Sequence, residues 1–398
     1  MIKIEDKSKC CGCWACENVC PVHCITMEMD EEGFRYPKVD LDVCINCHKC
    51  EKACPELKPE MDDSKPLANY VIQQKDKGIL RNSTSGGFYS AVAEYVIKQG
   101  GVVFGASFDK DMVLRHTHAE TLEDCKQFRG SKYVQSEIQH TFTEMLQYLK
   151  EGRLVVFSGT PCQIAGLYGF LGNRKYENLV TVDLVCHGTP SPLLLKKYLA
   201  HQAEVNHDKV VDYRSRDKYY GYDYSTATIY FEDNKHQYHK GKESDLMLGL
   251  YFKNLISRPS CYSCHFKTLN RVSDITIFDC WDAPSVSKEF SRDGATNVFI
   301  HTEKGAKVFE AIKDHFVWAP SNLDSIIKRD GVMIKHHVTP NPKRSEFFKD
   351  LQTMTIPQVE EKYDHKSALR RIIGEVKPIL HSLGVFCLYM KLKSKLKG

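Results

Sequence analysis

The residues most able to do chemistry are the cysteines, of which the chain has 17. The first ten residues, MIKIEDKSKC, contain no apolar segment of the kind that directs secretion, so clustered cysteines indicate metal or redox chemistry rather than disulfides. Residues 10–21 read CCGCWACENVCP, and residues 44–55 read CINCHKCEKACP. Both contain the pattern C-x2-C-x2-C-x3-C-P, so this part of the chain is an internal repeat of regularly spaced thiols.

This repeated pattern is typical of bacterial ferredoxins with two 4Fe–4S clusters, in which three close cysteines wrap one cubane and the fourth reaches the other. A pair of zinc knuckles is the alternative, which the repeated C-x3-C-P disfavours. Residues 25–40 alternate apolar and polar residues around a turn, as a β-hairpin would. Cys11 and Cys24 fall outside the pattern, and we expect small buried thiols there. The pattern predicts one cluster on Cys10, Cys13, Cys16 and Cys54, and another on Cys20, Cys44, Cys47 and Cys50.

A second set of thiols lies further along the chain. Cys261 and Cys264 form an isolated C-x2-C pair, which is half of a four-thiolate site. Cys162 and Cys186 each follow a predicted buried strand, and in open α/β sheets ligands gather beyond the carboxyl ends of strands. These four cysteines could therefore meet around a third cluster. The spacing also allows Cys162 to act as a nucleophile with His187 as its base, or the C-x2-C pair to form a redox disulfide or half a zinc site.

Two segments without cysteines are candidates for holding a dinucleotide. Ser83 or Thr84 would cap a long predicted helix, and helix N-termini bind phosphate groups. The chain has no G-x-G-x-x-G, which excludes the Rossmann fingerprint. Arg129 and Lys132 lie in a short polar loop that could hold phosphate or the negative charge of a flavin, although their spacing alone favours an ordinary solvated loop. The candidate cofactor contacts are Thr84, Ser85, Gly86, Gly87, Arg129 and Lys132.

Five motifs that follow the repeat in this order resemble one known family. They read STSGGFYSAVAEYV, RGSKYVQS, SGTPCQIAGL, DLVCHGTPSP and CYSCHFKTLNRVSDITIFDCWD, and the resemblance spans residues 1 to about 320. The family is that of the beta subunits of coenzyme F420-reducing hydrogenases and dehydrogenases, of which plant 7-hydroxymethyl chlorophyll a reductase looks like a relative. The resemblance implies an FAD-binding iron–sulfur core with its flavin region at Thr84–Gly87 and Lys132. It also implies a third 4Fe–4S cluster on Cys162, Cys186, Cys261 and Cys264.

One segment departs from the family pattern. Residues 274–282 read DITIFDCWD, with Phe278, Cys280 and Asp282 where the family has small residues or glycine. If this strand lines the flavin pocket, the substrate side is altered, so the deazaflavin substrate does not carry over. Cys280 could instead be a plain buried thiol.

The 398 residues, of which 42% are hydrophobic, suffice for two or three domains with cores of their own. We expect a mixed α/β (α+β) fold, with antiparallel strands in the Tyr- and Thr-rich residues 205–258. No apolar run reaches the roughly 18 residues of a membrane span, which favours a cytoplasmic protein. The expected domains are a ferredoxin module at 1–64, a flavin-binding body at 65–150 and 151–320, the latter carrying the third site, and a helical basic tail at 321–398.

Charge is unevenly distributed along the chain. The net charge of +4 is too small to indicate nucleic acid, but residues 1–64 hold 8 Lys and Arg against 14 Asp and Glu. Such an acidic module could dock on the basic face of a partner, with steering that weakens in salt. In the basic tail, the apolar residues 379–390 are too few to span a bilayer. The tail could lie as an amphipathic helix on an anionic membrane, or pack on the body or on a partner.

These features predict a converter between one-electron and two-electron carriers, because a cluster moves single electrons whereas a flavin can collect two. The main hypothesis is an FAD-dependent iron–sulfur oxidoreductase that passes electrons between ferredoxin, or a partner subunit, and a small-molecule substrate. The alternative is an electron-transfer subunit of a hydrogenase-like or formate-dehydrogenase-like complex, without a substrate of its own. A metal-binding interaction protein with purely structural clusters is a third reading. The sequence identifies no catalytic residue.

Overall fold

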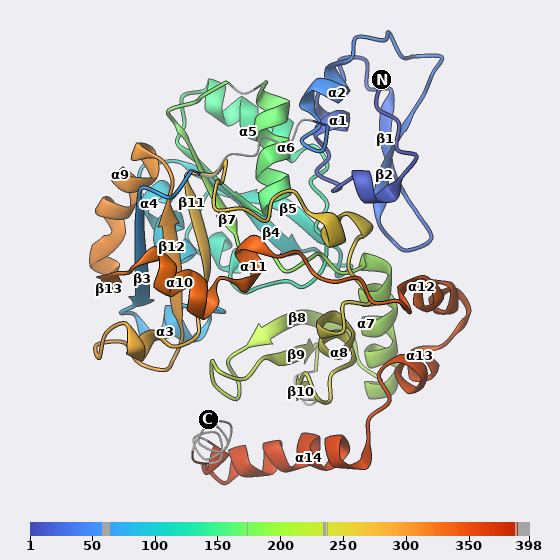
Figure 1. The fold of residues 1–398 in the computed structure, drawn as a ribbon, viewed down its shortest axis with the longest axis vertical. Helices are drawn as coiled ribbons and strands as arrows, with labels where there is room; N and C mark the ends of the chain where they lie inside the picture. Colours follow the sequence, from blue (N-terminus) through green and yellow to red (C-terminus); the bar gives the residue numbers. More distant parts are fainter. Residues whose placement is uncertain (58–63, 173, 234–235, 237, 387, 389–398) are drawn as a thin grey trace.

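The computed structural model describes the whole chain except residues 58–63, 173, 234–235, 237, 387 and 389–398. Part of the end of the predicted ferredoxin module and the end of the basic tail therefore lie outside the described residues. Figure 1 shows the N-terminal module against one side of a larger body, with the last described helix at the opposite end of the molecule.

The N-terminal module repeats its backbone as it repeats its cysteines. The short helices α1 (Ala15–Asn18) and α2 (Lys49–Ala53) each begin just after the second cysteine of a repeat. The residue preceding each helix, Trp14 or His48, has a positive φ, of 65° and 57° respectively. Non-glycine residues adopt this conformation only where their surroundings hold them in it. Both cysteine loops are therefore wound in the same way, as expected if each wraps the same kind of ligand.

A hairpin joins the two repeats. β1 (Ile25–Met29) pairs antiparallel with β2 (Arg35–Val39), which confirms the predicted hairpin. Its turn contains Gly33, with φ of 86°, and a Cβ atom there would lie 2.4 Å from the Cβ of Leu193. The hairpin turn is thus pressed against the body, which only glycine allows at this position.

The body is built on one mixed eight-stranded sheet, which confirms the predicted fold class. The strand order is β13-β3-β12-β11-β7-β6-β4-β5, and the central strands β11, β7, β6 and β4 run parallel while the other pairs are antiparallel. Strands from both predicted parts of the body contribute to this sheet. The strands are β3 (Ala68–Gln74), β4 (Val102–Phe108), β5 (Leu114–Ala119), β6 (Val155–Gly159), β7 (Leu179–Leu184), β11 (Ile275–Cys280), β12 (Ala295–Ile300) and β13 (Phe316–Pro320).

Helices cover both faces of the sheet. On one face, α4 (Phe88–Ile97) and α9 (Glu303–Ile312) lie over a core that includes Val103. On the other face, α5 (Thr141–Lys150) and α6 (Pro161–Leu171) pack with Phe104, the next residue of the same strand, because alternate residues point to opposite faces. The N-terminal module sits on this second face, beside α6 (Figure 1).

The module and α6 meet at two glycines of that helix. A Cβ atom at Gly166 would lie 2.6 Å from the Cβ of Cys13, and one at Gly169 would lie 2.1 Å from the backbone oxygen of Ala53. Real Cβ atoms do not come this close to other atoms, so both glycines are needed for the approach. The module is therefore packed directly on α6 rather than tethered loosely to the body.

A second, three-stranded sheet lies beside the first. β8 (Val210–Asp217), β9 (Thr226–Phe231) and β10 (Tyr238–Gly241) pair antiparallel, as the sequence predicts. Buried residues of this sheet share one core with the flanking helices. These helices are α7 (Pro192–Asn206), α8 (Leu246–Phe252), α12 (Arg344–Thr353) and α13 (Ile356–Tyr363). The shorter helices α3 (Lys77–Arg81), α10 (Leu323–Asp330) and α11 (Val332–Lys335) lie nearer the main sheet.

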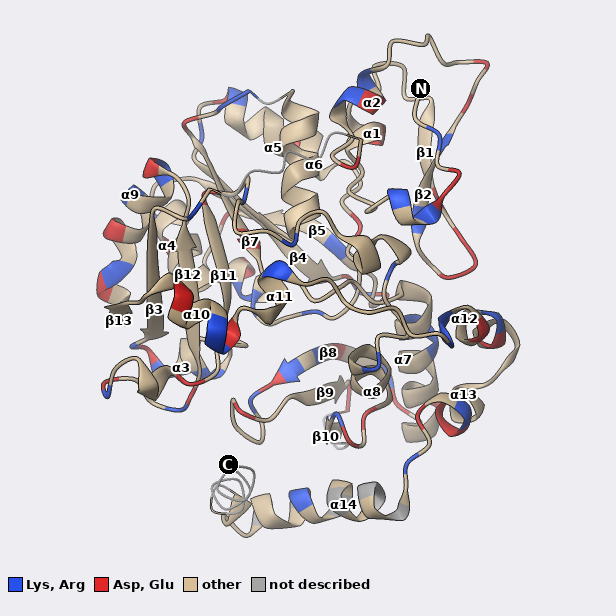
Figure 2. Ribbon diagram, in the orientation of Figure 1, with Lys and Arg blue, Asp and Glu red and all other residues tan. Residues whose placement is uncertain are grey.

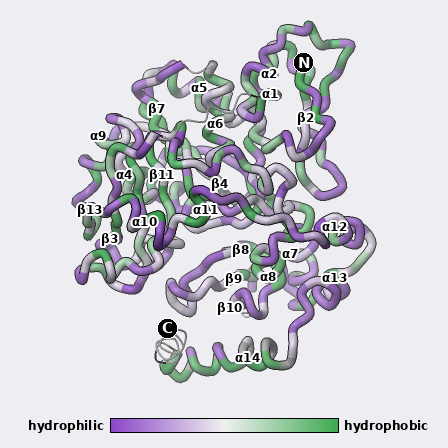
Figure 3. The backbone as a smooth tube through the Cα atoms, in the orientation of Figure 1, coloured by the Kyte–Doolittle hydropathy of each residue, from purple (hydrophilic) through white to green (hydrophobic). Residues whose placement is uncertain are grey.

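The chain closes with α14 (Ala368–Ser382), which confirms a helical C-terminal region. One side of this segment packs on the body, because Lys377 is 2% exposed and Phe386 contacts Tyr220. The other side exposes apolar residues, among them Leu369 and Leu383, each 67% exposed. Figure 3 shows the hydrophobic stretches along this helix. In the described part of the chain, no helix is long and apolar enough to cross a membrane.

Candidate functional site

The first predicted cluster site is formed within the N-terminal module. Burial raises the pKa of Cys16 well above that of a free thiol, and the charges of Cys13, Cys10 and Cys54 raise it further. Burial likewise raises the pKa of Cys54 to about 12, with Cys13 and Cys10 again adding to the shift. The four thiols are therefore electrostatic neighbours in a water-poor setting, although Cys54 is 38 residues or more from the others along the chain.

The second predicted cluster site lies at the outer end of the module. The backbone nitrogen of Ile2 donates to the Sγ of Cys50 at 3.3 Å. Cys24, which is outside the cysteine pattern, lies 3.5 Å from Cys20 between their sulfur atoms and also contacts Cys44. Cys24 is thus a buried thiol, as expected, but one that touches two predicted ligands. The remaining ligand, Cys47, is exposed.

The third predicted site collects four cysteines from three separate segments. Cys162 is the second residue of α6, Cys186 follows β7, and Cys261 and Cys264 lie in and just after a short turn at 259–263. All four line one small cavity. They meet because β6 and β7 are adjacent parallel strands whose carboxyl ends face the C-x2-C turn.

Hydrogen bonds made by neighbouring residues position the cysteines of this third site. Thr160 and Gln163 form a capping box that starts α6 directly before Cys162. The backbone nitrogen of Thr189 donates to the Sγ of Cys261 at 3.4 Å, as donors commonly do to cluster sulfurs. Burial raises the pKa of Cys264 to about 12, so binding iron would displace its proton.

The donor set of the third site fits a cubane. Among the residues that the structure describes, no three His, Cys, Asp or Glu side chains converge on a point for one metal ion. A cubane makes a different demand, because its four thiolates bind four different irons. Four half-buried thiols around one cavity meet that demand. Cys162 contacts Cys11 and Thr160, whereas both ring nitrogens of His187 meet Asn254 and Met333, so no nucleophile–base pair is formed here.

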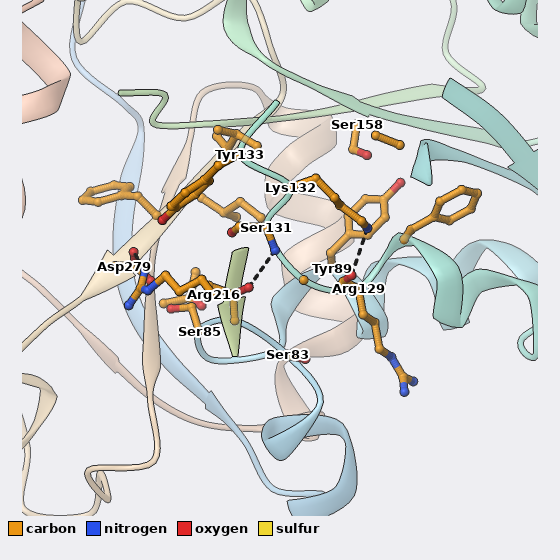
Figure 4. Close-up of a pocket in the computed structure, with 18 of the residues that line it drawn as sticks. Ser83, Ser85, Tyr89, Arg129, Ser131, Lys132, Tyr133, Ser158, Arg216 and Asp279 are labelled. Carbon is orange, nitrogen blue, oxygen red and sulfur yellow. Dashed lines mark hydrogen bonds and ion pairs between the residues drawn. The ribbon is translucent and has the colours of Figure 1, made fainter. Parts of the chain in front are cut away.

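A large cavity of about 970 Å³ opens beside the third site, lined by residues from both sheets (Figure 4). Its volume is at the upper end of the range for ligand and cofactor pockets. Five of the six predicted cofactor contacts line it: Thr84, Ser85, Gly87, Arg129 and Lys132.

Gly86, the sixth predicted contact, does not line the cavity. Its backbone nitrogen donates to the Oγ1 of Thr296 at 2.7 Å, and a Cβ atom there would lie 2.5 Å from the backbone oxygen of Ile72. The close approach at Gly86 is thus made to β3 and β12, not to a ligand. A contact between Gly86 and a cofactor stays a prediction.

The prediction that Ser83 or Thr84 caps the helix α4 is wrong. α4 begins after Gly87, which has φ of 82° and offers no side chain. Ser83 instead donates through its Oγ to the backbone oxygen of Ile79, and Thr84 accepts from the backbone nitrogen of Ser131 at 2.7 Å. Thr84 therefore ties the two predicted cofactor segments together, and the start of α4 is left without a side-chain cap at the cavity wall.

Two cations of the cofactor segments behave differently. Lys132 donates through its Nζ to the backbone oxygens of Gln127 and Arg129, both at 2.9 Å, and loss of hydration lowers its pKa to about 7. Arg129 donates to Ser90 and points away from Lys132 in Figure 4. Lys132 is therefore the better placed of the two to respond to the charge of a bound ligand.

Sequence reasoning missed Arg216 of β8, which is 6% exposed and lines the cavity. Its Nη1 pairs with Asp279, its guanidinium lies 4.3 Å from the ring centre of Trp281, and its Nη2 is buried without a hydrogen-bond partner. A buried donor without a partner is costly, which indicates that a ligand completes it. The only sequence signal was an arginine inside a tyrosine-rich strand.

The segment that departs from the family pattern contributes to the cavity in part. Phe278 and Trp281 line the cavity, whereas Cys280 does not; it is 1% exposed and belongs to a small core that includes Val71. Burial raises the pKa of Cys280 to about 12. Cys280 is thus a buried thiol, and Asp282 is not part of the cavity wall.

The third site and the large cavity share a wall. Both are lined by one loop, residues 186–189, together with Thr160. The opposite wall of the third site includes Cys11 and Glu56, which belong to the N-terminal module. The structure therefore places the module, the four cysteines and the large cavity in sequence, each in contact with the next.

Two segments of the chain match models of known protein families. Residues 9–57 match the model of the 4Fe-4S dicluster domain, and residues 152–324 match that of the C terminus of the coenzyme F420 hydrogenase/dehydrogenase beta subunit. The F subunit of the F420H2 dehydrogenase of Methanosarcina mazei is 23% identical over 326 residues, which cover 77% of this chain and 82% of that protein. The I 2 subunit of the NADH-quinone oxidoreductase of Geobacter metallireducens is 41% identical over 71 residues, which cover 17% of this chain and 54% of that protein.

Among solved structures, one chain of the F420-reducing [NiFe] hydrogenase complex from Methanosarcina barkeri aligns with a TM-score of 0.47 at 20% identity. The alignment covers 71% of this chain and 99% of that one. The family resemblance carried by the sequence motifs is confirmed by the two family models. One segment of this chain, residues 9–57, thus matches a 4Fe–4S dicluster domain, and another, residues 152–324, is similar to the C terminus of coenzyme F420 hydrogenase/dehydrogenase beta subunits.

Proposed function

We propose that this chain is the electron-transfer subunit of a larger oxidoreductase, relaying electrons between its dicluster domain and an FAD in the large cavity. The observation that carries the proposal is the shared wall, since the loop at 186–189 and Thr160 line both the four-cysteine site and the large cavity. A cluster supplies single electrons and a flavin exchanges two, so the pair couples one-electron to two-electron chemistry. The described relatives are named as subunits, which supports a role inside a complex.

The residues assigned to the two proposed cofactors follow from the geometry. Cys162, Cys186, Cys261 and Cys264 would hold a third 4Fe–4S cluster, because their thiols come from three segments and line one cavity. The FAD would be held by the loop from Thr84 to Gly87 and by Lys132. The stacked rings of Tyr133 and Tyr251, with centres 4.6 Å apart, offer a flat apolar wall for a ring system.

A second candidate function is an oxidoreductase with its own substrate in the same cavity. The observation that favours it is Arg216, whose buried Nη2 is left for a ligand beside the stacked rings of Tyr222 and Trp281. This part of the cavity, with an arginine beside two stacked aromatic rings, suits a planar molecule with an anionic group. The substrate would then lie against the part of the wall where Phe278 departs from the family pattern.

One experiment separates these candidates. The isolated chain is reconstituted anaerobically with iron, sulfide and FAD, reduced by a low-potential viologen, and offered artificial acceptors and a panel of planar anions. The electron-transfer proposal predicts tight FAD binding and turnover with artificial acceptors only. Repeated consumption of one panel member without a partner protein would favour the second candidate. A chain that takes up no flavin would contradict both.

The pKa of Lys132, lowered to about 7, makes FAD binding pH-dependent. Below this pH the ammonium is protonated and attracts an anionic ligand, and as the pH rises through it the charge is lost. Arg214 nearby opposes the protonated form and Asp212 favours it. We therefore expect the affinity for FAD, measured by quenching of flavin fluorescence, to fall about fivefold or more between about pH 6 and about pH 8.

Two variants control this expectation. Lys132→Arg keeps its charge throughout and should bind FAD with little pH dependence, whereas Lys132→Gln should bind weakly at every pH. Equal affinities for all three proteins would rule out Lys132 as a flavin contact.

We also propose that α14 brings the chain to an anionic membrane surface. The exposed apolar residues Leu369, Ile372, Val376, Ile379 and Leu383 recur every three or four residues along this segment, and so form one stripe. Figure 2 shows where charged residues lie along the described part of the helix, but Lys377 there is 2% exposed and faces the body. The basic charge beside the stripe comes from the following residues 391–397, which contain four lysines in sequence. A helix with an apolar stripe and basic neighbours suits the interface of anionic lipids.

Flotation with vesicles tests the membrane proposal. The intact chain should float with phosphatidylserine-containing vesicles and not with neutral ones, while the double variant Leu369→Glu/Leu383→Glu should stay behind. Val205→Glu, at an exposed valine of α7, is the matched control and should float like the intact chain. If the double variant floats equally well, α14 does not bind the membrane and its stripe covers another surface.

A further inference from the structure

Arg258 is the largest fully buried side chain of the described residues, with 1% of its surface exposed. It lies directly before the turn that carries Cys261, whose backbone nitrogen donates to the oxygen of Arg258 at 3.0 Å. Its guanidinium reaches out of the body into the dicluster domain. The group therefore stands between the first cluster site and the third.

The hydrogen bonds of Arg258 are made mainly to the dicluster domain. Nε donates to the backbone oxygen of Cys10 at 2.6 Å, and Nη2 donates to the backbone oxygen of Arg35 at 2.9 Å and lies 3.4 Å from the Sγ of Cys10. Nη1 donates to the Oε1 of Gln135 at 2.9 Å. The plane of the guanidinium covers the ring of Tyr36, 4.2 Å from its centre.

The absence of a side chain at Gly12 leaves space for the guanidinium of Arg258. A Cβ atom at this residue would lie 2.7 Å from the Nη1 of Arg258 and 2.9 Å from its Cζ. The glycine in the first cysteine motif is thus required by an arginine that lies 246 residues further along the chain.

This buried cation has no carboxylate partner among the ion pairs of the described residues. A buried charge is stable only if an opposite charge compensates it. Its electrostatic neighbours are the thiols of Cys10, Cys11 and Cys261 and the phenol of Tyr36. The carboxyl group of Glu56 also interacts with it, but burial raises the pKa of Glu56 and so disfavours its charged form. Four thiolates around a 4Fe–4S core leave a net negative charge, which grows by one unit when the cluster is reduced. A cluster bound in the dicluster domain would therefore supply the negative charge that the carboxylates of the protein do not.

We propose that Arg258 is the counter-ion of the cluster held by Cys10, Cys13, Cys16 and Cys54, and that it raises the reduction potential of this cluster above that of the outer one. A fixed positive charge stabilises the more negative, reduced state more than the oxidised state, and charge and hydrogen bonds to sulfur are known determinants of cluster potentials. Among the described contacts, the cation beside the ligands of the outer cluster is the ammonium group of Met1, which feels Cys50 and Cys44 but is part-exposed and paired with Glu51 at 2.9 Å. Electrons that enter at the outer cluster would thus be drawn towards the body. This inference requires only Arg258 and the clusters of the dicluster domain, and it stands whether or not the chain binds flavin.

Potentiometric titration followed by electron paramagnetic resonance tests the proposal. In Arg258→Gln, the ratio of reduced to oxidised inner cluster at a fixed potential should fall at least tenfold, which corresponds to about 59 mV for one electron. Arg258→Lys, which keeps the charge, should change the ratio by less than half of this on a logarithmic scale. The outer cluster should titrate as in the unaltered chain in both variants.

Arg344→Gln provides the matched control. Arg344 also joins the body to the dicluster domain, but through a two-pronged contact with Glu32. Its loss should weaken docking without moving either potential. An unchanged inner-cluster potential in an iron-replete Arg258→Gln chain would overturn the proposal.

A measurement on the unaltered chain covers the case in which the arginine variants do not fold. With 15N-labelled arginine, pulsed resonance of the reduced inner cluster should show a nitrogen hyperfine coupling that is absent from the outer cluster. If the reduced inner cluster shows no such coupling, Arg258 is not its counter-ion. Iron content and flavin binding, measured on the same samples, report separately on the proposed function.

Discussion

Replacement of Cys264 by serine is expected to lower the iron content of the reconstituted chain from about 12 to about 8 atoms. Cys264 lines the cavity of the third site, with Cys162, Cys186 and Cys261 around it. A cubane that loses one of four thiolates at a half-buried site is poorly retained, whereas the eight cysteines of the dicluster domain are untouched. Iron and sulfide analysis of the purified protein should show the loss of this one cluster from each chain.

The control for this prediction is Cys280→Ala. Cys280 is buried, at 1% exposure, but it lies in a separate small core and lines neither the large cavity nor the third site. This variant should keep about 12 irons. A content of about 8 irons in the unaltered chain would remove the third cluster from the proposal, and the C-x2-C pair would then be a redox or zinc pair.

Gly169→Ala in α6 is expected to destabilise the chain by about 1–3 kcal/mol, although alanine normally stabilises a helix relative to glycine. The new Cβ would lie 2.1 Å from the backbone oxygen of Ala53, which cannot rotate away as a flexible side chain could. The dicluster domain must therefore shift away from α6. Denaturant unfolding should show the lower stability, and limited proteolysis should release the module faster.

Gly78→Ala in α3 is the matched control, since a Cβ there would meet only the Oδ1 of Asp76, at 3.2 Å. It should unfold at the same denaturant concentration as the unaltered chain, or a higher one. If Gly169→Ala unfolds at the same denaturant concentration as the unaltered chain and resists proteolysis equally, the module does not pack closely on α6.

The sequence predicts those features of the site that depend on local spacing. The eight cysteines of the dicluster domain follow a pattern that one cubane geometry imposes, and the domain is confirmed. The strands before Cys162 and Cys186 are apolar runs bounded by glycine and proline, and two such parallel strands end at the same edge of a sheet. The meeting of these cysteines could therefore be anticipated from order along the chain alone.

Other features depend on contacts between distant segments and leave no local signal. Arg216 and Arg258 are charged residues in ordinary surroundings along the chain, and only the packing of two sheets and a module buries them. Gly86 and Gly87 look alike in sequence, but one packs against β3 and the other adopts a left-handed conformation at a helix start. The wrong cap at Ser83 or Thr84 follows from the same ambiguity.

The order of the ligands along the chain has a consequence for how the protein is made. All eight dicluster cysteines lie within residues 10–54, so the growing chain presents a complete pair of cluster sites before any part of the body has been synthesised. The four cysteines of the third site span residues 162–264, and they meet only after β6 and β7 have paired and the turn at 259–263 has closed over them. Iron at the first two sites would therefore report that the module is present, whereas iron at the third would report that the whole body has folded.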